Sequence, residues 1–117
     1  MLRRQRTYLC PVDVALSVID GKWKPLILFE LKKGRRRFGA LHATIPSVSH
    51  KVLTQQLRQL EATGLIARIS RGDGLAYELT DFGRTLRPAL TALAAWGLRH
   101  HATLGVALES SRSSGRA

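Results

Sequence analysis

The chain has 117 residues, of which 44% are hydrophobic and 23% charged, so it is long enough for one domain with an ordinary core. Its 19 lysines and arginines outnumber its 8 acidic residues and give a formal net charge of +11 at pH 7. Such a charge indicates a polyanionic partner, either nucleic acid or an acidic membrane surface. The single cysteine excludes an intramolecular disulfide and a thiolate zinc cage, and it favours a reducing, cytosolic compartment.

The positive charge is concentrated towards the amino terminus and reaches its highest density in residues 32–37. We expect residues 1–8 to form a basic arm, residues 9–104 the folded domain, and the Ser- and Gly-rich residues 105–117 a disordered tail. No apolar stretch approaches the roughly 18 residues that a membrane span requires. Pro11 and Asp13 interrupt the only candidate secretion signal, so we expect neither export nor membrane insertion.

The first half of the domain is predicted to contain three helices. The first covers residues 11–19, with a proline in its first turn, and the second begins near Pro25 and is apolar nearly all round, as a buried helix is. Gly34 ends the second helix, and the basic run 35–37 after it has the composition of a loop. A short third helix covers residues 38–43 and ends before Pro46, since a residue that precedes proline avoids the helical region.

The second half is predicted to contain a longer helix, a hairpin and a last helix. Ser49 is a good N-cap for a helix that continues to Thr63 and ends at Gly64. Residues 65–70 and 75–79 are typical of two strands, with a glycine-rich turn between them. The last helix starts at Thr80, but Pro88 lies inside it and costs about 3 kcal/mol there, so we expect a bend, or two helices meeting, near Arg84.

This order of elements is that of a helix-turn-helix followed by a wing, which makes the fold mainly α with a small β-hairpin. At 100° per residue, the leucines at 53, 57 and 60 fall within about 60° of one another on the helix 49–63. Lys51, Gln55 and Arg58 fall nearly opposite, with Thr54 on the flank. One face of this helix is therefore predicted to lie in the core and the other in solvent.

The exposed side chains are those that suit recognition of DNA in the major groove. Lysine and arginine donate to guanine O6 and N7, glutamine pairs with adenine, and arginines in loop and wing neutralise phosphates. We therefore predict phosphate contacts at Arg35 and Arg36, and further DNA contacts at Arg37, Ser47, Ser49, His50, Lys51, Thr54, Gln55, Arg58 and Arg71. The alternative is that the helix face is merely solvated and that residues 35–37 form an ordinary charged loop.

Several motifs, in the same order and spacing over roughly residues 8–98, resemble the HxlR-type winged helix-turn-helix transcriptional regulators of bacteria. They are Cys10-Pro11-Val12, Asp20-Gly21-Lys22-Trp23, Arg37-Phe38-Gly39-Ala40-Leu41, Ile45-Pro46, Ser49-His50-Lys51-Val52-Leu53-Thr54, Leu57-Arg58-Gln59-Leu60-Glu61, Gly64-Leu65-Ile66 and Tyr77-Glu78-Leu79-Thr80. The resemblance implies a cytoplasmic homodimer that binds double-stranded DNA at a pseudo-palindromic operator and usually represses a nearby gene.

In this family the first and last helices form the dimer interface. The positions that map to it are Val12, Leu16, Ile19, Leu90, Leu93 and Trp96, for which packing within one subunit is the alternative. The wing departs from the family pattern, because it is shorter and lacks a proline pair. This departure leaves open whether Arg71 reaches DNA.

Some members of the family sense oxidants or electrophiles through a cysteine at the position of Cys10. This residue precedes a helix N-terminus and follows three arginines, and both features favour a thiolate. The alternative is an unreactive thiol. The four histidines form no metal motif and no catalytic constellation is present, so we expect neither an enzyme, nor a metal, nor a cofactor. The rival function is non-specific binding of nucleic acid by charge alone, as in a nucleoid or RNA-associated protein.

Overall fold

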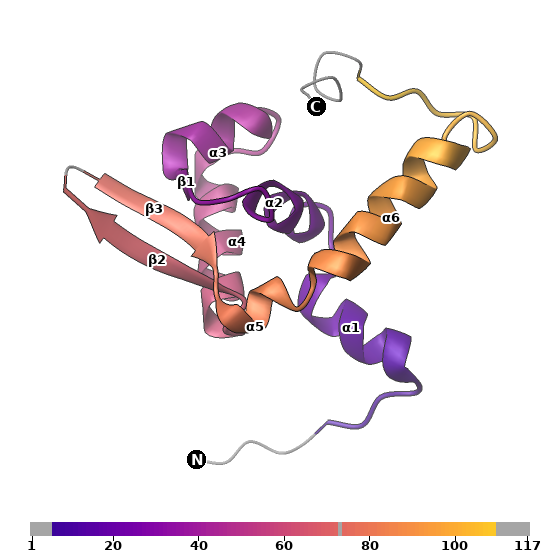
Figure 1. Cartoon of the computed structure of the whole chain (residues 1–117), viewed down its shortest axis with the longest axis horizontal. Coiled ribbons are helices and arrows are strands. Elements are labelled where there is room, and N and C mark those ends of the chain that lie inside the picture. Colours follow the sequence, from indigo (N-terminus) through magenta and orange to yellow (C-terminus); the bar gives the residue numbers. More distant parts are fainter. Residues whose placement is uncertain (1–5, 73, 110–117) are drawn as a thin grey trace.

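The computed structural model of the chain describes residues 6–72 and 74–109. Its elements are α1 (Pro11–Ile19), α2 (Lys24–Leu31), β1 (Arg36–Arg37), α3 (Phe38–Thr44), α4 (His50–Ala62), β2 (Ile66–Arg71), β3 (Gly74–Leu79), α5 (Asp81–Arg84) and α6 (Arg87–His100). Helix α2 lies at the centre, with α3, α4 and the sheet on one side of it and α6 on the other (Figure 1). The predicted class, a mainly helical winged helix-turn-helix, is confirmed.

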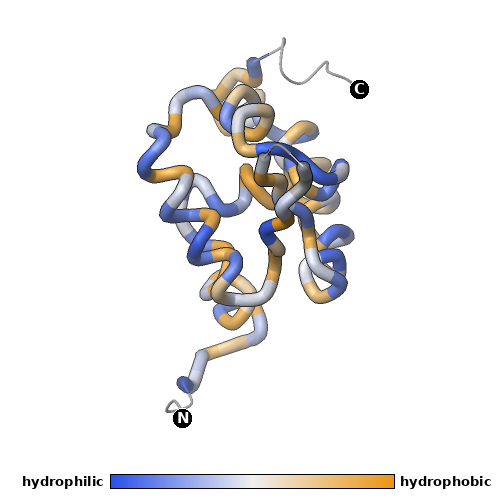
Figure 2. Tube along the Cα trace, turned by 90° about the vertical axis from the view of Figure 1, so that its left-hand side faces the viewer, coloured by the Kyte–Doolittle hydropathy of each residue, from blue (hydrophilic) through white to orange (hydrophobic). Residues whose placement is uncertain are grey.

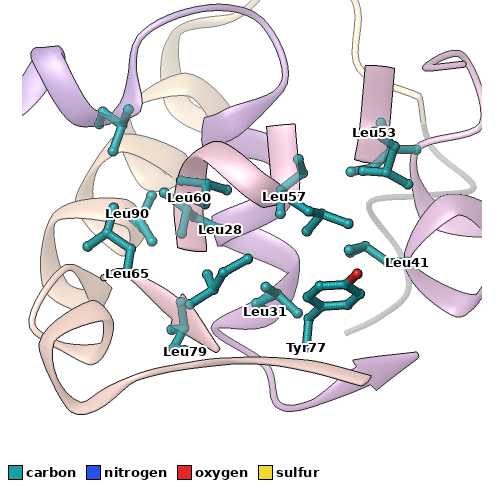
Figure 3. Packing of buried hydrophobic residues seen from close by; sticks show 14 of the residues in the cluster. Leu28, Leu31, Leu41, Leu53, Leu57, Leu60, Leu65, Tyr77, Leu79 and Leu90 are labelled. Atoms are coloured by element: carbon teal, nitrogen blue, oxygen red, sulfur yellow. The ribbon is translucent and has the colours of Figure 1, made fainter. Parts of the chain in front are cut away.

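The core forms where α2, α3, α4 and the sheet meet. Its largest fully buried side chains are Ile27, Leu28, Leu31, Leu41, Leu53, Leu57, Leu60 and Leu65. Leucines from α2 and α4 point towards one another, with Tyr77 and Leu79 of β3 beneath them (Figure 3). Burial of a leucine stabilises a fold by about 1.5–3 kcal/mol, so this cluster is the main source of stability for the domain.

The sheet contains a third strand that the sequence analysis placed in a loop. The strand order is β1-β3-β2, with both pairs antiparallel. In β1, Arg36 pairs with Tyr77 and Arg37 with Ala76, so the basic run is attached to the wing rather than free. A two-residue strand of arginines carries no alternation of apolar and polar residues, and the expectation of a loop was therefore wrong.

The predicted last helix is two helices. Helix α5 ends at Arg84, and Pro88 lies in the first turn of α6, where its missing N–H costs nothing. Thr80 caps α5, because its Oγ1 accepts from Gly83 N at 2.9 Å and also donates to Gly64 O at 2.6 Å. The expectation that two helices meet near Arg84 is therefore correct, and the alternative of one bent helix is not.

Helices α1 and α6 extend away from the core (Figure 1). Figure 2 shows that hydrophobic and hydrophilic residues alternate along the chain, as amphipathic elements require. On the outer helices, however, several large apolar side chains are exposed, among them Leu16, Leu93 and Trp96. Within the described residues no helix is long and apolar enough to cross a bilayer.

The predicted arm and tail lie mostly outside the described residues, since these exclude 1–5 and 110–117. Residues 6–8 form no helix or strand, and neither do residues 106–109. The chain turns back after α6, where Val106 N donates to His101 O at 3.0 Å and Gly105 has a positive φ of 78°.

Candidate nucleic-acid interface

Helix α4 is fixed at both ends and along its inner face. Ser49 Oγ accepts a hydrogen bond from Val52 N at 3.1 Å and so satisfies a free donor of the first turn. Gly64, with a φ of +84°, ends the helix in a conformation that favours glycine. Leu53, Leu57 and Leu60 are at most 1% exposed. The predicted N-cap, end and buried face of this helix are all confirmed.

The outer face of α4 carries the three side chains that the sequence placed there. Lys51, Gln55 and Arg58 are all exposed, while Thr54 is half-buried and its Oγ1 donates to His50 O at 2.9 Å. Within the described residues, no hydrogen bond or ion pair engages the side chains of Lys51, Gln55 or Arg58. Two cationic groups and an amide are therefore free to bind an external partner.

Two acidic residues, one of α4 and one of β3, form ion pairs with arginines outside α4. Glu61 of α4 forms an ion pair with Arg68 of β2 at 3.6 Å, and Glu78 of β3 forms one with Arg35 at 3.2 Å. These carboxylates consequently do not engage Arg58, although Glu61 lies one helical turn from it. The sequence predicted a phosphate contact at Arg35 but showed no sign of its pairing with Glu78, which lies far away in the chain.

The remaining predicted arginines lie along the wing. Arg36 is half-buried, and its Nη1 donates to Arg35 O at 3.0 Å. Arg37 is exposed and its guanidinium lies beside Gly74, where a Cβ would come within 2.6 Å of Nη1. Glycine at 74 therefore leaves room for this guanidinium. Arg71 ends β2, but its side chain lies outside the described part of the structure.

Ser47 and His50 lie at the turn that precedes α4 and at its first residue, and both are exposed. Two residues of α3 that the sequence analysis did not assign, Phe38 and His42, lie close to His50. Phe38 and His42 are four residues apart and therefore share one face of α3, which is the sequence feature that could have predicted that they lie together.

Tyr77 of β3 is buried in the core that α4 covers. Burial raises the pKa of its hydroxyl, and the nearby carboxylate of Glu61 raises that pKa further, while Arg68 and Arg58 act in the opposite direction. Charges of α4 and β2 thus converge on one buried phenol. Tyr77 thus packs in the core beside the ion pair of Glu61 with Arg68, which links α4 to β2.

The residues predicted for a dimer interface fall into two groups. Ile19 and Leu90 are 6% and 3% exposed and belong to the core of the chain. The other four residues are 49–64% exposed: Val12, Leu16, Leu93 and Trp96. Cys10 is exposed at the N-cap of α1, and its side chain makes no capping hydrogen bond. No cluster of three or more potential metal ligands occurs within the described residues.

A helix-turn-helix with an exposed cationic second helix and an adjoining three-stranded wing defines a winged helix-turn-helix DNA-binding protein. Residues 18–104 match the family described as HxlR-like helix-turn-helix. The chain belongs to this family of transcriptional regulators, which are DNA-binding proteins rather than enzymes.

Individual relatives agree with this assignment. The chain is 42% identical over 99 residues to the uncharacterized HTH-type transcriptional regulator YtcD of Bacillus subtilis (strain 168), covering 82% of this chain and 79% of the relative. The structure is similar to that of the redox regulator HypR in its reduced form, with a TM-score of 0.77, 36% identity, and coverage of 82% and 98% of the two chains. For the oxidized form of HypR the TM-score is 0.73 at 39% identity, with coverage of 77% and 96%.

Proposed function

We propose that this transcriptional regulator is a homodimeric repressor that inserts α4 into the major groove of a pseudo-palindromic operator. The observation that supports this proposal is the two-sidedness of α4, which buries three leucines and leaves Lys51, Gln55 and Arg58 exposed and without a hydrogen bond or ion pair to any described residue. Arg37 and Ser47, which flank α3, extend the same surface towards the phosphate backbone. Lysine, glutamine and arginine together provide donors and an acceptor for base edges.

The dimer is supported by the exposed apolar side chains of α1 and α6. Leu16, Leu93 and Trp96 are 49–60% exposed, and no described element of the same chain covers them. Exposed clusters of large apolar side chains mark interaction surfaces. A twofold dimer through these helices presents two α4 helices to major grooves about one turn, or 34–36 Å, apart.

Selection of duplexes from a random library by the purified protein tests this function. The proposal predicts a consensus with two inverted half-sites whose centres lie about 10 base pairs apart. The rival function, non-specific binding by charge, predicts that no consensus emerges and that all duplexes bind equally with the same salt dependence. That second result would contradict the proposed function.

A second candidate function is redox or electrophile sensing at Cys10. It is favoured by the exposure of this thiol at the start of α1 and by the similarity to HypR, which is a redox regulator. Two Cys10 thiols, one from each subunit, would lose two protons and two electrons to an oxidant and form one intersubunit disulfide. Because α1 contributes to the proposed dimer seam, such a bond would change the relative placement of the two α4 helices.

Operator binding before and after mild treatment with diamide, which accepts the two electrons and two protons, tests the sensor role. We expect oxidation to change the affinity of the native protein and to have no effect on Cys10→Ser. Equal responses from the two proteins would show that Cys10 is not the sensor, without affecting the assignment of α4.

A further inference from the structure

Three aromatic rings gather beside the turn between α3 and α4. Phe38 is the first residue of α3, His42 follows one helical turn later, and His50 is the first residue of α4. The ring centroids of Phe38 and His50 lie 4.5 Å apart, and the rings are tilted by 50°. His42 lies 6.4 Å from Phe38 and 6.3 Å from His50, edge-on to the latter. Two rings of the preceding helix therefore contact the first side chain of the recognition helix.

The two histidines differ in whether their ring nitrogens have a hydrogen-bond partner among the described residues. Nε2 of His42 lies 2.8 Å from the carbonyl oxygen of Val48, which can only accept, so this nitrogen carries a proton and donates. Val48 is 2% exposed and precedes His50 by two residues, so this bond fixes the chain just before α4 begins. Within the described residues, no hydrogen bond engages the ring nitrogens of His50, which is exposed.

We propose that Phe38 and His42 are positioning residues that hold the imidazole of His50 in the orientation in which it contacts DNA. This inference depends on the proposed function, since it assumes that the N-terminal end of α4 enters the groove. The chemistry is a ring N–H that donates to an acceptor on DNA, either a phosphate oxygen or an acceptor on a base edge.

The residues that orient the ring of His50 leave its nitrogens available to contact DNA. Contacts between rings favour tilted and edge-on geometries at 4.5–7 Å, so the ring of Phe38, 4.5 Å from that of His50, restricts the imidazole without using its nitrogens. A side chain that is already ordered loses less conformational entropy when it binds. His42 acts through the carbonyl of Val48 and Phe38 acts through its ring face, so substitutions can separate the two contributions.

Affinity for the duplex recovered by selection, measured by fluorescence anisotropy, tests these roles. Phe38→Leu keeps an apolar side chain but removes the ring, and His42→Phe keeps a ring but removes the donor to Val48. We expect each to weaken binding by about three- to tenfold, the range that one aromatic contact or hydrogen bond supports. His42→Gln retains a donor for Val48 and should bind within about twofold of the native protein.

Coupling to His50 distinguishes positioning from a general structural role. In a His50→Ala background, Phe38→Leu and His42→Phe should each weaken binding by less than about twofold more. Equal losses in both backgrounds would overturn the inference, as would an undiminished affinity of His50→Ala itself. A loss in His50→Ala that is the same on the selected and on a scrambled duplex identifies a phosphate contact, and a loss confined to the selected duplex identifies a base contact.

Two further measurements keep this test independent of the proposed function. Circular dichroism melting should show that each variant is folded. In the free protein, the ring protons of His50 should show a ring-current shift in NMR spectra that Phe38→Leu removes, and an unchanged resonance would contradict the packing of these rings. Selection that yields no consensus would refute operator recognition, whereas a consensus combined with uncoupled substitutions would refute only the role of Phe38 and His42.

Discussion

The segment from α2 to β3 and the two outer helices differ in where their apolar side chains lie. In the first, Leu28 and Leu31 of α2 and the leucines of α4 are almost completely buried within the same chain, although Leu26 is 44% exposed. In α1 and α6, only Ile19 and Leu90 are buried, and residues as large as Trp96 remain 56% exposed. Ile19 and Leu90 thus complete the core of the winged segment, whereas the remaining large apolar side chains of α1 and α6 stay exposed. This difference separates the part that we propose binds DNA from the part that we propose forms the dimer.

The largest expected effect comes from the inner region. Leu57→Ala should lower the free energy of unfolding by about 2–5 kcal/mol, because it leaves a cavity behind the exposed face of α4. Leu75→Ala is the matched control, since Leu75 is 43% exposed on the wing, and it should cost less than about 0.5 kcal/mol. Urea denaturation measures both, and similar losses would contradict the distinction between buried and exposed leucines.

Two glycines differ in the space around them, one at a close contact of α5 and one on the open surface of α6. A Cβ at Gly83 would come within 2.0 Å of the backbone oxygen of Leu65, so Gly83→Ala should destabilise the fold by about 1–3 kcal/mol. Nothing lies within 4 Å of a Cβ at Gly97 in α6, and Gly97→Ala should stabilise that helix by about 0.5–1 kcal/mol. Thermal melting should show opposite signs, and a neutral Gly83→Ala would refute the close packing of α5 on the turn after α4.

Trp96→Ala tests the function assigned to the outer helices. Buried interface tryptophans commonly contribute more than about 1 kcal/mol, so this change should weaken dimerisation by about tenfold. Analytical ultracentrifugation over a range of protein concentrations measures it, with Leu75→Ala as the control, since Leu75 is an exposed apolar residue of the wing and not of α1 or α6. An unchanged dissociation constant for Trp96→Ala would place the interface elsewhere.

The smallest expected effect concerns pH. Because the pKa of Tyr77 is raised in the folded state, the native protein retains the phenolic proton at a pH where the unfolded chain has lost it. Stability from this group is therefore fully present below about pH 10, the ordinary tyrosine value, and is lost as the pH rises through the higher folded-state value. Tyr77→Phe should reduce this alkaline loss in unfolding measurements, and an identical pH profile would contradict the effect.

Local signals were sufficient to predict helix α4. The Ser49 cap, the three leucines and Gly64 are all short-range features of α4, and each appears in the structure as expected. The exposed positions of Lys51, Gln55 and Arg58 follow from the same periodicity. Sequence reasoning is reliable here because helical geometry alone determines which side chains share a face.

Contacts between distant residues could not be predicted in the same way. The strand β1 exists because Arg36 and Arg37 pair with β3, about forty residues later, and its own composition is that of a loop. The ion pair between Arg35 and Glu78 has the same origin. The group of Phe38, His42 and His50 depends on how α3 packs beside α4, which the turn between them determines and which periodicity does not describe.

We propose that the exposed face of α4 recognises specific bases. The most direct test is the affinity of Arg58→Ala for the selected duplex and for a scrambled duplex of equal composition, each measured at several salt concentrations. We expect a loss of about tenfold on the selected duplex, the range for one good base contact, and a much smaller loss on the scrambled one. Equal losses on both duplexes, accompanied only by a shallower salt dependence, would contradict it.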